Sequence, residues 1–402
     1  MALLAELLTI EEAQRLILER ARPLPSESVR LEDAAGRVVA ETARAAVDLP
    51  PFSSSAMDGF ALRAQDTPGQ LPVGGRIAAG APAARALEPG EAMAIATGGV
   101  VPEGADAVIP FEYVVDHDNA IEVSDPADPG ANVRPRGGDI RAGDAVVDAG
   151  MRLGPAQIGA LAAAGIAEVT CAARPRASVL TTGTELAPPG RPLGPGEVYE
   201  ANGVILAAQL VSAGAVVRRL PAVADDEVAH REALTRGLES DLLVTSGGVS
   251  VGPHDLVRRV EAELGVEEVF WRVAVKPGKP IAFGVRGATL VFGLPGNPVS
   301  ALVGFELFVR PAVLSLQGHA SPLPRFESGQ LAAAVRRNPV RDELVRARML
   351  ATEDGGATTL EPVSGQESHM IARAAGADAL VLVPRGEGEL PPGAPARYLR
   401  LD

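Results

Sequence analysis

The run DLLVTSGGVSVGPHD at residues 241–255 decides the fold class of this chain. An apolar stretch suited to a buried strand, Asp241–Thr245, leads directly into a glycine-rich loop, and a helical pattern follows. Glycines let the backbone come close to a ligand, and N–H groups at a helix N-terminus attract anions. Ser250 adds a hydroxyl and Asp255 a carboxylate. These residues fit an anion-binding loop, and they fit equally well a plain strand-to-helix turn in which Asp255 caps the helix. Taken alone, they do not decide between the two.

Working outward, strands and helices alternate on both sides of this loop. The predicted strands are 177–180, 215–220, 241–245 and 289–292, and the predicted helices are 202–213, 225–237, 255–264 and 299–316. Such alternation predicts a doubly wound, largely parallel α/β sheet. Ligands bind beyond the carboxyl ends of the strands in folds of this kind. We therefore expect the site at the loops 181–185, 246–255 and 293–298.

The sequence on either side of the α/β stretch is rich in short β-like runs between glycines and prolines, which predicts flanking β-rich domains. Thr9-Ile-Glu-Glu12 is a capping box that opens an amphipathic helix. The predicted linking domain, helical and extended, comprises 1–49 and 141–173, and an inserted β-rich domain comprises 50–140. The α/β domain comprises 174–318, and a small C-terminal β-barrel comprises 319–402.

Composition excludes several classes of protein. The formal charge is −14 over 402 residues, and no dense Lys/Arg run is present, which argues against a nucleic-acid partner. Cys171 is the only cysteine, so a disulfide framework and a cysteine zinc site are excluded. The most apolar stretches, 154–173 and 291–316, are interrupted by polar residues and predict no membrane span. We expect a cytoplasmic protein whose anionic substrates are held by local cations and backbone N–H groups.

Cations and helix starts supply the candidate anion contacts. Lys276-Pro-Gly-Lys-Pro280, expected at the end of the next strand, presents two ammonium groups on a turn with little backbone freedom. Gly293-Leu-Pro-Gly-Asn-Pro298 leads into an apolar helix and makes Ser300 a second candidate. Arg346 lies on a predicted strand, and its position alone predicts a surface residue.

Carboxylates supply the candidate metal ligands. Glu185 follows the first strand of the α/β stretch, Asp58 and Asp139 lie in the β-rich section, and Asp225 precedes a helix that it or its neighbours would cap. Several carboxylates without a His/Cys set suit Mg²⁺ better than zinc.

Taken together and in order, the motifs resemble those of the molybdopterin molybdenumtransferase family, the MoeA and gephyrin E-domain group. No single motif is decisive, but the ordered set is specific and spans about residues 10–372. The matching segments are Pro51–Ala61, Thr97–Val108, Asn132–Ile140, Arg174–Arg176, Thr182–Leu186, Ser246–Asp255, Lys276–Pro280 and Gly293–Ser300.

The resemblance implies an elongated four-domain chain that forms a homodimer, with the active site between the α/β domain of one subunit and other domains of its partner. It implies that adenylylated molybdopterin and molybdate give molybdenum cofactor and AMP with Mg²⁺. The implied catalytic residues are Asp255, Ser250, Glu185 and Asp58. The implied anion and substrate contacts are Thr97, Gly247, Gly248, Lys276, Lys279, Ser300, Arg346 and Ser368. The implied metal ligands are Asp255, Glu185, Asp225 and Asp139.

One departure from the family pattern and two alternatives remain open. Glu200-Ala201-Asn202 stands where the family often has aspartate-serine-asparagine, which leaves the role of that stretch undecided. The α/β domain also resembles molybdopterin adenylyltransferase, which is an alternative activity and, if the chain is the transferase, a candidate upstream partner. A non-catalytic cofactor-binding scaffold is the third hypothesis.

Overall fold

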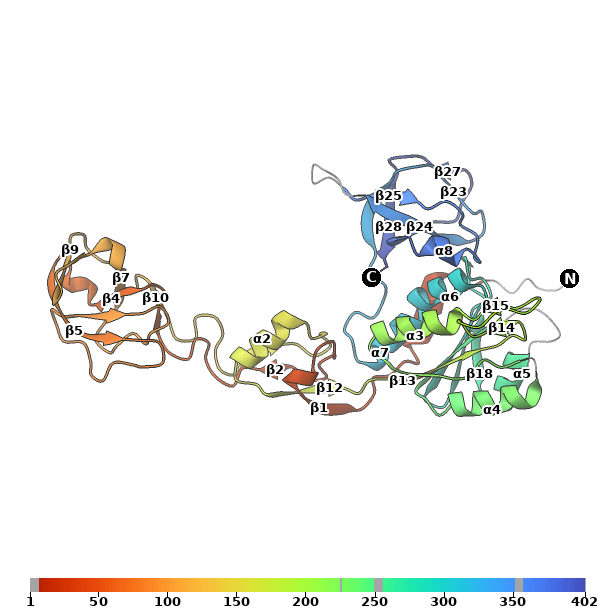
Figure 1. Ribbon diagram of the computed structural model, residues 1–402, viewed down its shortest axis with the longest axis horizontal. Helices are drawn as coiled ribbons and strands as arrows, with labels where there is room; N and C mark the ends of the chain where they lie inside the picture. The colour runs from red at the N-terminus through yellow and green to blue at the C-terminus, as the bar shows by residue number, and fades with distance from the viewer. Residues whose placement is uncertain (1–6, 225, 249–255, 351–356, 402) are drawn as a thin grey trace.

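The computed structural model describes residues 7–224, 226–248, 256–350 and 357–401. Figure 1 shows an elongated molecule in which a small β-domain lies at one end, a linking unit follows, and an α/β domain carries a β-barrel at the other end. The predicted elongated arrangement of an α/β domain with flanking β-rich parts is therefore confirmed.

The N-terminal helix α1 (Ile10–Leu18) begins at the predicted capping box. Thr9 Oγ1 accepts from the Glu12 N–H at 3.1 Å, and the Glu12 carboxylate accepts from the Thr9 N–H at 2.8 Å. Its buried face packs against the long helix of the α/β domain, where Gln14 donates to the Leu307 carbonyl at 2.9 Å. This helix is therefore part of the α/β core.

The linking unit is built from strand pairs that are distant in sequence. Strand β1 (Ser26–Arg30) pairs with β12 (Glu168–Ala172), and β2 (Ala43–Arg44) pairs with β11 (Ala145–Val147). Helix α2 (Pro155–Ala163) covers them, as Figure 1 shows. Cys171 is fully buried here, and burial raises the pKa of its thiol, as expected for a core residue rather than a nucleophile.

The outer domain is a mostly antiparallel sheet, reached through the short pair β3 (Ser54–Ser55) and β10 (Val133–Arg134). The strand order across the sheet is β7-β4-β6-β5-β9-β8, formed by Ala107–Pro110, Gly59–Leu62, Ala92–Ile95, Gly69–Ile77, Ala120–Val123 and Val115–Asp116. A separate hydrophobic core forms beneath it around Phe60, Leu71 and Ile121.

The α/β domain has the predicted largely parallel sheet. Its order is β16-β13-β17-β21-β20-β18, formed by Val216–Arg219, Arg176–Thr181, Leu242–Ser246, Thr289–Leu294, Ala282–Arg286 and Glu267–Trp271. Only β20 runs against its neighbours, so all the other carboxyl ends meet at one edge. The covering helices are α3 (Asn202–Ser212), α4 (Glu227–Gly237), α5 (Leu256–Glu263) and the composite helix described next.

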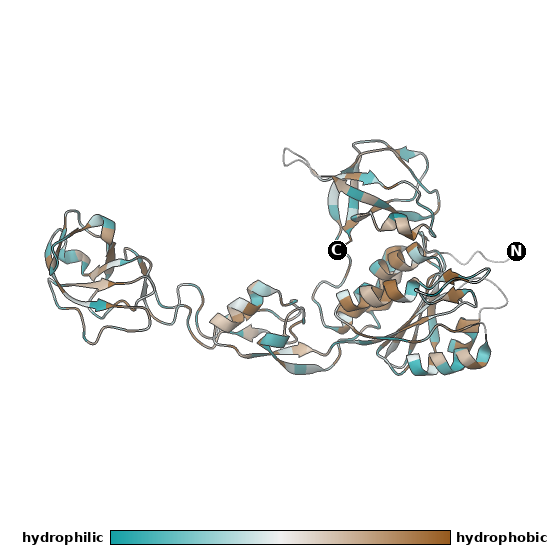
Figure 2. Ribbon diagram, in the orientation of Figure 1, coloured by the Kyte–Doolittle hydropathy of each residue, from teal (hydrophilic) through white to brown (hydrophobic). Residues whose placement is uncertain are grey.

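The predicted long apolar helix begins at Pro298 and ends at Leu316. It consists of α6 (Pro298–Gly304), a π-helical turn (Phe305–Val309) and α7 (Arg310–Leu316). Pro311 has no N–H to donate to the preceding turn of the helix, and a missing hydrogen bond of this kind commonly causes a π-helical turn. The helix is apolar and long enough to span a membrane, but 78% of it is buried inside the protein, so its apolar surface is used in the core. Figure 2 shows α3 and this helix as the most hydrophobic ones, while α4 and α5 carry a hydrophilic outer face.

The C-terminal domain is a closed barrel. Its sheet order is β24-β25-β22-β28-β26, and pairing of β26 with β24 closes the ring. These strands are Asp342–Leu350, Thr359–Pro362, Glu327–Leu331, Pro395–Arg400 and Ala379–Val383. Strand β19 (Val275–Lys276) extends this sheet from the α/β side by pairing with β24, which joins the two domains. A short helix, α8 (Ile371–Ala374), lies against α6.

Candidate functional site

Three strand-end loops converge at the carboxyl edge of the α/β sheet. The ends of β13, β17 and β21 are in register, with Thr181 opposite Ser246 and Ser246 opposite Leu294. Beyond the strands, the Thr182 N–H donates to the Ser246 carbonyl at 3.0 Å, and the Gly247 N–H donates to the Leu294 carbonyl at 3.1 Å. The loops predicted to hold the site, 181–185, 246–255 and 293–298, therefore lie side by side over the described residues, and the location of the site there stays a prediction.

Asn202, the first residue of α3, ties two of these loops together. Its Nδ2 donates to Ser246 Oγ and to the Gly296 carbonyl, both at 2.8 Å. Ser246 Oγ in turn donates to the Pro295 carbonyl at 3.0 Å. Because both amide hydrogens are used, the side-chain orientation is fixed, and with it the point where the glycine-rich loop leaves the sheet.

Gly247 and Gly248 begin the glycine-rich loop in a conformation that requires glycine. Their φ angles are +97° and +65°, in the left-handed region. A Cβ on Gly247 would lie 2.6 Å from the Thr182 carbonyl oxygen, and one on Gly248 would lie 2.5 Å from Val257 Cγ2. Ser250 and Asp255, predicted as catalytic residues, lie outside the described residues.

A cavity of about 600 Å³ opens where the loops meet. Its polar lining includes Glu185, an exposed carboxylate, and Tyr199, whose side chain is 47% exposed. His369 and Ile371 close the barrel side of the cavity, and Asn202 lines its floor. The cavity therefore has an acidic group, flat ring systems and a fixed amide, and it lies between the α/β domain and the barrel.

The Glu200-Ala201-Asn202 departure has a structural explanation. Glu200 is buried, with 6% of its surface exposed, and its carboxylate accepts from the Gly203 N–H at 2.6 Å and from Arg219 at 2.9 Å. Both bonds are made inside the chain, so this carboxylate caps the start of α3 and neutralises Arg219.

The lysine turn lies at the seam between the α/β domain and the barrel. Lys276 ends a strand, as predicted, but this strand, β19, pairs with barrel strand β24 and not with the α/β sheet. Backbone pairing to the barrel becomes available only after the C-terminal domain folds back on this segment. Lys276 Nζ lies 2.9 Å from the buried Glu343 carboxylate, whereas Lys279 is exposed. Gly278, with φ +110°, lies against Ser300.

Arg346 is fully buried, with 1% of its surface exposed, so the prediction of a surface residue was wrong. Its Nη1 donates to the Met370 carbonyl at 2.7 Å, and its Nη2 donates to the Gly365 and Glu367 carbonyls at 2.8 and 3.3 Å. Burial lowers the pKa of this guanidinium from its ordinary value. Strand position could not predict this, because the carbonyls come from a loop about 20 residues further on. Its implied anion-binding role stays a prediction.

The loop held by Arg346 carries His369 to the cavity, and Ser368 is the residue before it. The Val299 N–H donates to the Ser368 carbonyl at 3.0 Å, which ties this barrel loop to the first turn of α6. Ser300 lies one residue further along α6 and is buried. The structure thus brings Lys276, Lys279, Ser300 and Ser368 to one region, the seam beside the cavity.

The predicted site residues of the outer domain lie elsewhere. Asp58 Oδ1 accepts from the Thr97 N–H at 2.7 Å, and hydrogen bonds from Thr97 lower the pKa of the Asp58 carboxyl. Asp139 lies at the neck, where its N–H donates to the Leu49 carbonyl. Figure 1 shows the outer domain separated from the α/β domain by the whole linking unit, so one chain does not bring these groups to the cavity.

The predicted metal ligands are likewise not assembled within the described part of the chain. Asp225 lies outside the described residues, and its neighbour Asp226 caps α4 by accepting from the Ala229 N–H at 2.8 Å. Among the residues that the structure describes, no group of three or more His, Cys, Asp or Glu side chains could hold a metal ion.

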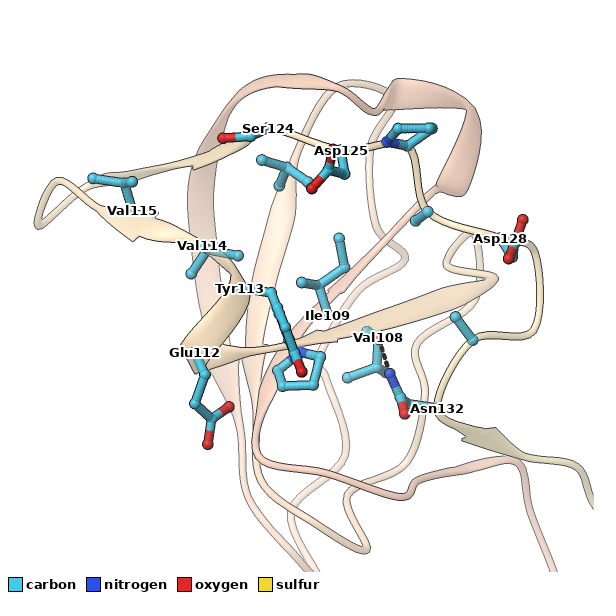
Figure 3. Close-up of a pocket in the computed structure, with 15 residues that line it drawn as sticks. Val108, Ile109, Glu112, Tyr113, Val114, Val115, Ser124, Asp125, Asp128 and Asn132 are labelled. Carbon is cyan, nitrogen blue, oxygen red and sulfur yellow. Dashed lines mark hydrogen bonds between the residues drawn. The ribbon is translucent and has the colours of Figure 1, made fainter.

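A second hollow, of about 460 Å³, lies in the outer domain (Figure 3). It is bordered by β7 and by the segment that ends at Asn132, whose amide donates to the Val108 carbonyl at 2.9 Å. Its charged lining residues, within the described part of the chain, are the carboxylates Glu112, Asp125 and Asp128. The cavity of the α/β domain is also lined by carboxylates, Glu185 and Glu200, but it lies at the strand ends where ligands bind in folds of this kind, so it is the better candidate for a substrate site.

Sequence reasoning missed three positioning residues of this site. Asn202, Glu343 and Gln366 act through side-chain bonds to segments far away in sequence. The helix-start position of Asn202 was a usable signal for a cap, but nothing in the sequence indicates that its amide faces two other loops.

The fold and this arrangement define a class: a doubly wound α/β protein with a polar ligand cavity at the carboxyl edge of its sheet and cations at the seam with a β-barrel. Comparison with known proteins narrows the class. Residues 8–165 match the MoeA N-terminal region (domain I and II), residues 178–315 a probable molybdopterin binding domain, and residues 318–401 the MoeA C-terminal region (domain IV).

Individual relatives agree with these matches. Molybdopterin molybdenumtransferase 2 of Mycobacterium tuberculosis is 36% identical over 400 residues, covering 96% of this chain and 97% of that protein. The molybdopterin molybdenumtransferase of Haemophilus influenzae is 39% identical over 317 residues, 78% of each chain. The crystal structure of the molybdopterin biosynthesis MoeA protein from Pyrococcus horikoshii superposes with a TM-score of 0.81 at 31% identity, covering 98% of this chain and 99% of that one. The chain belongs to the molybdopterin molybdenumtransferase (MoeA) family.

Proposed function

We propose that this protein inserts molybdenum from molybdate into adenylylated molybdopterin, releasing AMP and forming molybdenum cofactor. The observation that carries the proposal is the convergence of three strand-end loops on a cavity of about 600 Å³. The cavity adjoins the Lys276–Pro280 turn through the first turn of α6. A ring-bearing phosphorylated substrate thus finds a pocket and cations side by side.

The charges beside the cavity suit both anions of the reaction. Molybdate is a tetrahedral dianion, and ammonium groups with hydroxyl donors replace its water shell. Lys279 is exposed and available for this, while Glu343 holds Lys276 in place. Cleaving the phosphoanhydride breaks the bond between the adenylyl phosphorus and the bridging oxygen, and AMP leaves with an oxygen from water. That step depends on charge neutralisation and alignment more than on a protein nucleophile.

A Mg²⁺ ion would supply further neutralisation of the phosphoanhydride. Glu185 fits such an ion in part, because it offers an exposed carboxylate at the cavity rim. Asp255 and Asp225 are the other proposed ligands of the α/β domain, and Asp139 is the proposed ligand from the outer domain.

We further propose that the working unit is a homodimer. Asp58 and Thr97 lie together in the outer domain, far from the cavity of their own chain, so a partner subunit must bring them there. Helix α3 supports the proposal because it has no charged residue and exposes Val204 and Val211 by 46% and 61%. An exposed apolar helix face of this kind is typical of subunit interfaces. We place the protein in the cytoplasm, where molybdopterin adenylyltransferase would supply its substrate.

The test is AMP release from adenylylated molybdopterin by the purified protein, with molybdate and tungstate compared, with and without Mg²⁺. We expect AMP release that depends on molybdate, and loss of that release in Lys279→Ala with an unchanged melting profile. Conversion of ATP and molybdopterin to the adenylylated product would instead favour the adenylyltransferase. Binding of molybdopterin without AMP release would favour a scaffold.

Mixed dimers test the proposed subunit arrangement. Asp58→Ala and Lys279→Ala homodimers are each expected to be inactive. Random mixing of the two is expected to restore about a quarter of the wild-type sites, because a mixed dimer has one site with both defects and one with neither. No recovery on mixing would contradict a site shared between subunits.

A further inference from the structure

Arg272 lies at the ligand-binding edge of the α/β sheet, although no motif includes it. Strand β18 is parallel to β21, and its last residue, Trp271, stands in one row across the sheet with Ala282, Gly293 and Thr245. Arg272 is the next residue, and its N–H donates to the Ile281 carbonyl at 2.9 Å. It therefore lies about 14 Å, three strand spacings, from the end of β17, where the glycine-rich loop starts.

Arg272 also lies beside Lys279. The Ile281 N–H and the Val273 N–H both donate to the Lys279 carbonyl, at 3.0 and 3.1 Å. The lysine turn and the Arg272 segment are thus held together by their backbones. The lysine turn carries the Lys279 side chain and the other segment carries the Arg272 side chain, so two cationic residues lie at the same edge of the sheet.

The backbone of Arg272 adopts a conformation that arginine rarely adopts. Its φ is +81°, in the left-handed region that favours glycine. Such outliers persist only where the surroundings hold them, and they cluster at functional sites. A glycine would meet the backbone requirement without strain, so the presence of arginine indicates a use for its side chain.

The guanidinium of Arg272 is held in position without being neutralised. It stacks on the indole of Trp271 at 3.7 Å from the ring centroid. Arg258 also stacks on that ring, at 4.2 Å, but it forms an ion pair with Glu268 at 2.6 Å. Within the described parts of the chain, Arg272 has no carboxylate within ion-pair distance. It is half-buried, so its charge faces less water than a free surface arginine does.

We propose that Arg272 binds a phosphate oxygen of the phosphoanhydride substrate, as a cation additional to the Lys276 and Lys279 pair. This inference rests on the proposed function, because it names the substrate group that Arg272 contacts. A planar guanidinium that is already stacked loses little freedom on binding, and its donor fork matches two oxygens of a phosphate.

The experiment compares Arg272→Gly, Arg272→Gln and Arg272→Lys with the wild type in the AMP-release assay. Arg272→Gly removes the cation and relieves the backbone, so we expect a melting temperature equal to or above that of the wild type. We expect its KM for adenylylated molybdopterin to rise about tenfold to hundredfold, the loss of one charge-assisted bond, with kcat little changed. Arg272→Gln is expected to raise KM similarly, and Arg272→Lys to recover part of the affinity.

Arg286→Gln is the matched control, because Arg286 ends β20 at the opposite edge of the same sheet. We expect its KM to equal that of the wild type. Titration calorimetry with inorganic pyrophosphate gives a readout that needs no turnover. Weaker pyrophosphate binding by Arg272→Gly than by Arg286→Gln supports the inference even if the wild type releases no AMP, in which case only the proposed function fails. Equal pyrophosphate affinity and equal KM in all variants would overturn it.

Discussion

Replacing Arg346 by methionine tests how the barrel builds one side of the site. The guanidinium donates to the Gly365, Glu367 and Met370 carbonyls and is buried beneath the loop that carries Ser368. Methionine fills part of the space but has no donor. The substitution therefore leaves three carbonyls without their partner, and the loop must rehydrate or rearrange.

The magnitude follows from these bonds. A buried acceptor that loses a charged partner costs about 1–3 kcal/mol, and water can re-solvate part of a loop near the surface. Three such acceptors lose their donor and water restores part of the loss, so we expect a decrease of about 3–5 kcal/mol in the free energy of unfolding of the barrel. In a domain of this size that lowers the melting temperature by more than about 10 °C.

Differential scanning calorimetry measures this effect. The barrel has a core of its own, but its residues Leu344, Ala374 and Leu380 also pack into the core of the α/β domain. We expect the barrel transition to shift most, and AMP release to fall with it because Ser368 is displaced. The control is Arg348→Met on the same strand, whose exposed side chain donates to the Gly376 carbonyl at 3.2 Å. It should change stability by less than about 0.5 kcal/mol. An unshifted barrel transition in Arg346→Met would refute the reasoning.

Two further predictions concern the other junctions of the α/β domain. Asn202→Ala removes both hydrogen bonds that the Asn202 amide makes to the strand-end loops, so we expect a loss of about 1–2 kcal/mol in the free energy of unfolding by urea, and reduced activity. Asn202→Asp should lose more, because its carboxylate would face two acceptors. Wild-type stability in both variants would contradict the role given to this amide. Burial and the nearby Arg152 lower the pKa of His319 below its ordinary 6.5. As the pH falls, His319 therefore takes up a proton in the unfolded chain before it does so in the folded one. The contribution of neutral His319 to stability is present above pH 6.5 and is lost as the pH falls through the folded-state pKa. Thermal melts from pH 8 to 5 should show a smaller acid loss in His319→Gln than in the wild type, and identical pH profiles would count against this assignment.

Features that depend on neighbouring residues could be predicted from the sequence, whereas contacts between distant segments could not. The capping box at Thr9, the strand that ends at Ser246 and the glycine requirement of Gly247 were all readable, because each depends on neighbours within a few residues. The burial of Arg346 was predicted wrongly, and the pairing of the Lys276 strand with the barrel was not predicted. Both depend on segments that approach only after distant parts of the chain pack together.

The sequence by itself determined the α/β class, the edge of the sheet where the strand-end loops meet and the kinds of residue there, since periodicity, glycines and charge are properties of short segments. Only the tertiary structure decided which of those residues are free to meet a ligand. Glu200 and Arg346 satisfy their charges inside the chain, whereas Lys279 is exposed and Arg272 stacks on Trp271. The physical reason is that a charged side chain acquires its role from the partners that burial brings within hydrogen-bond distance, and those partners are distant in sequence.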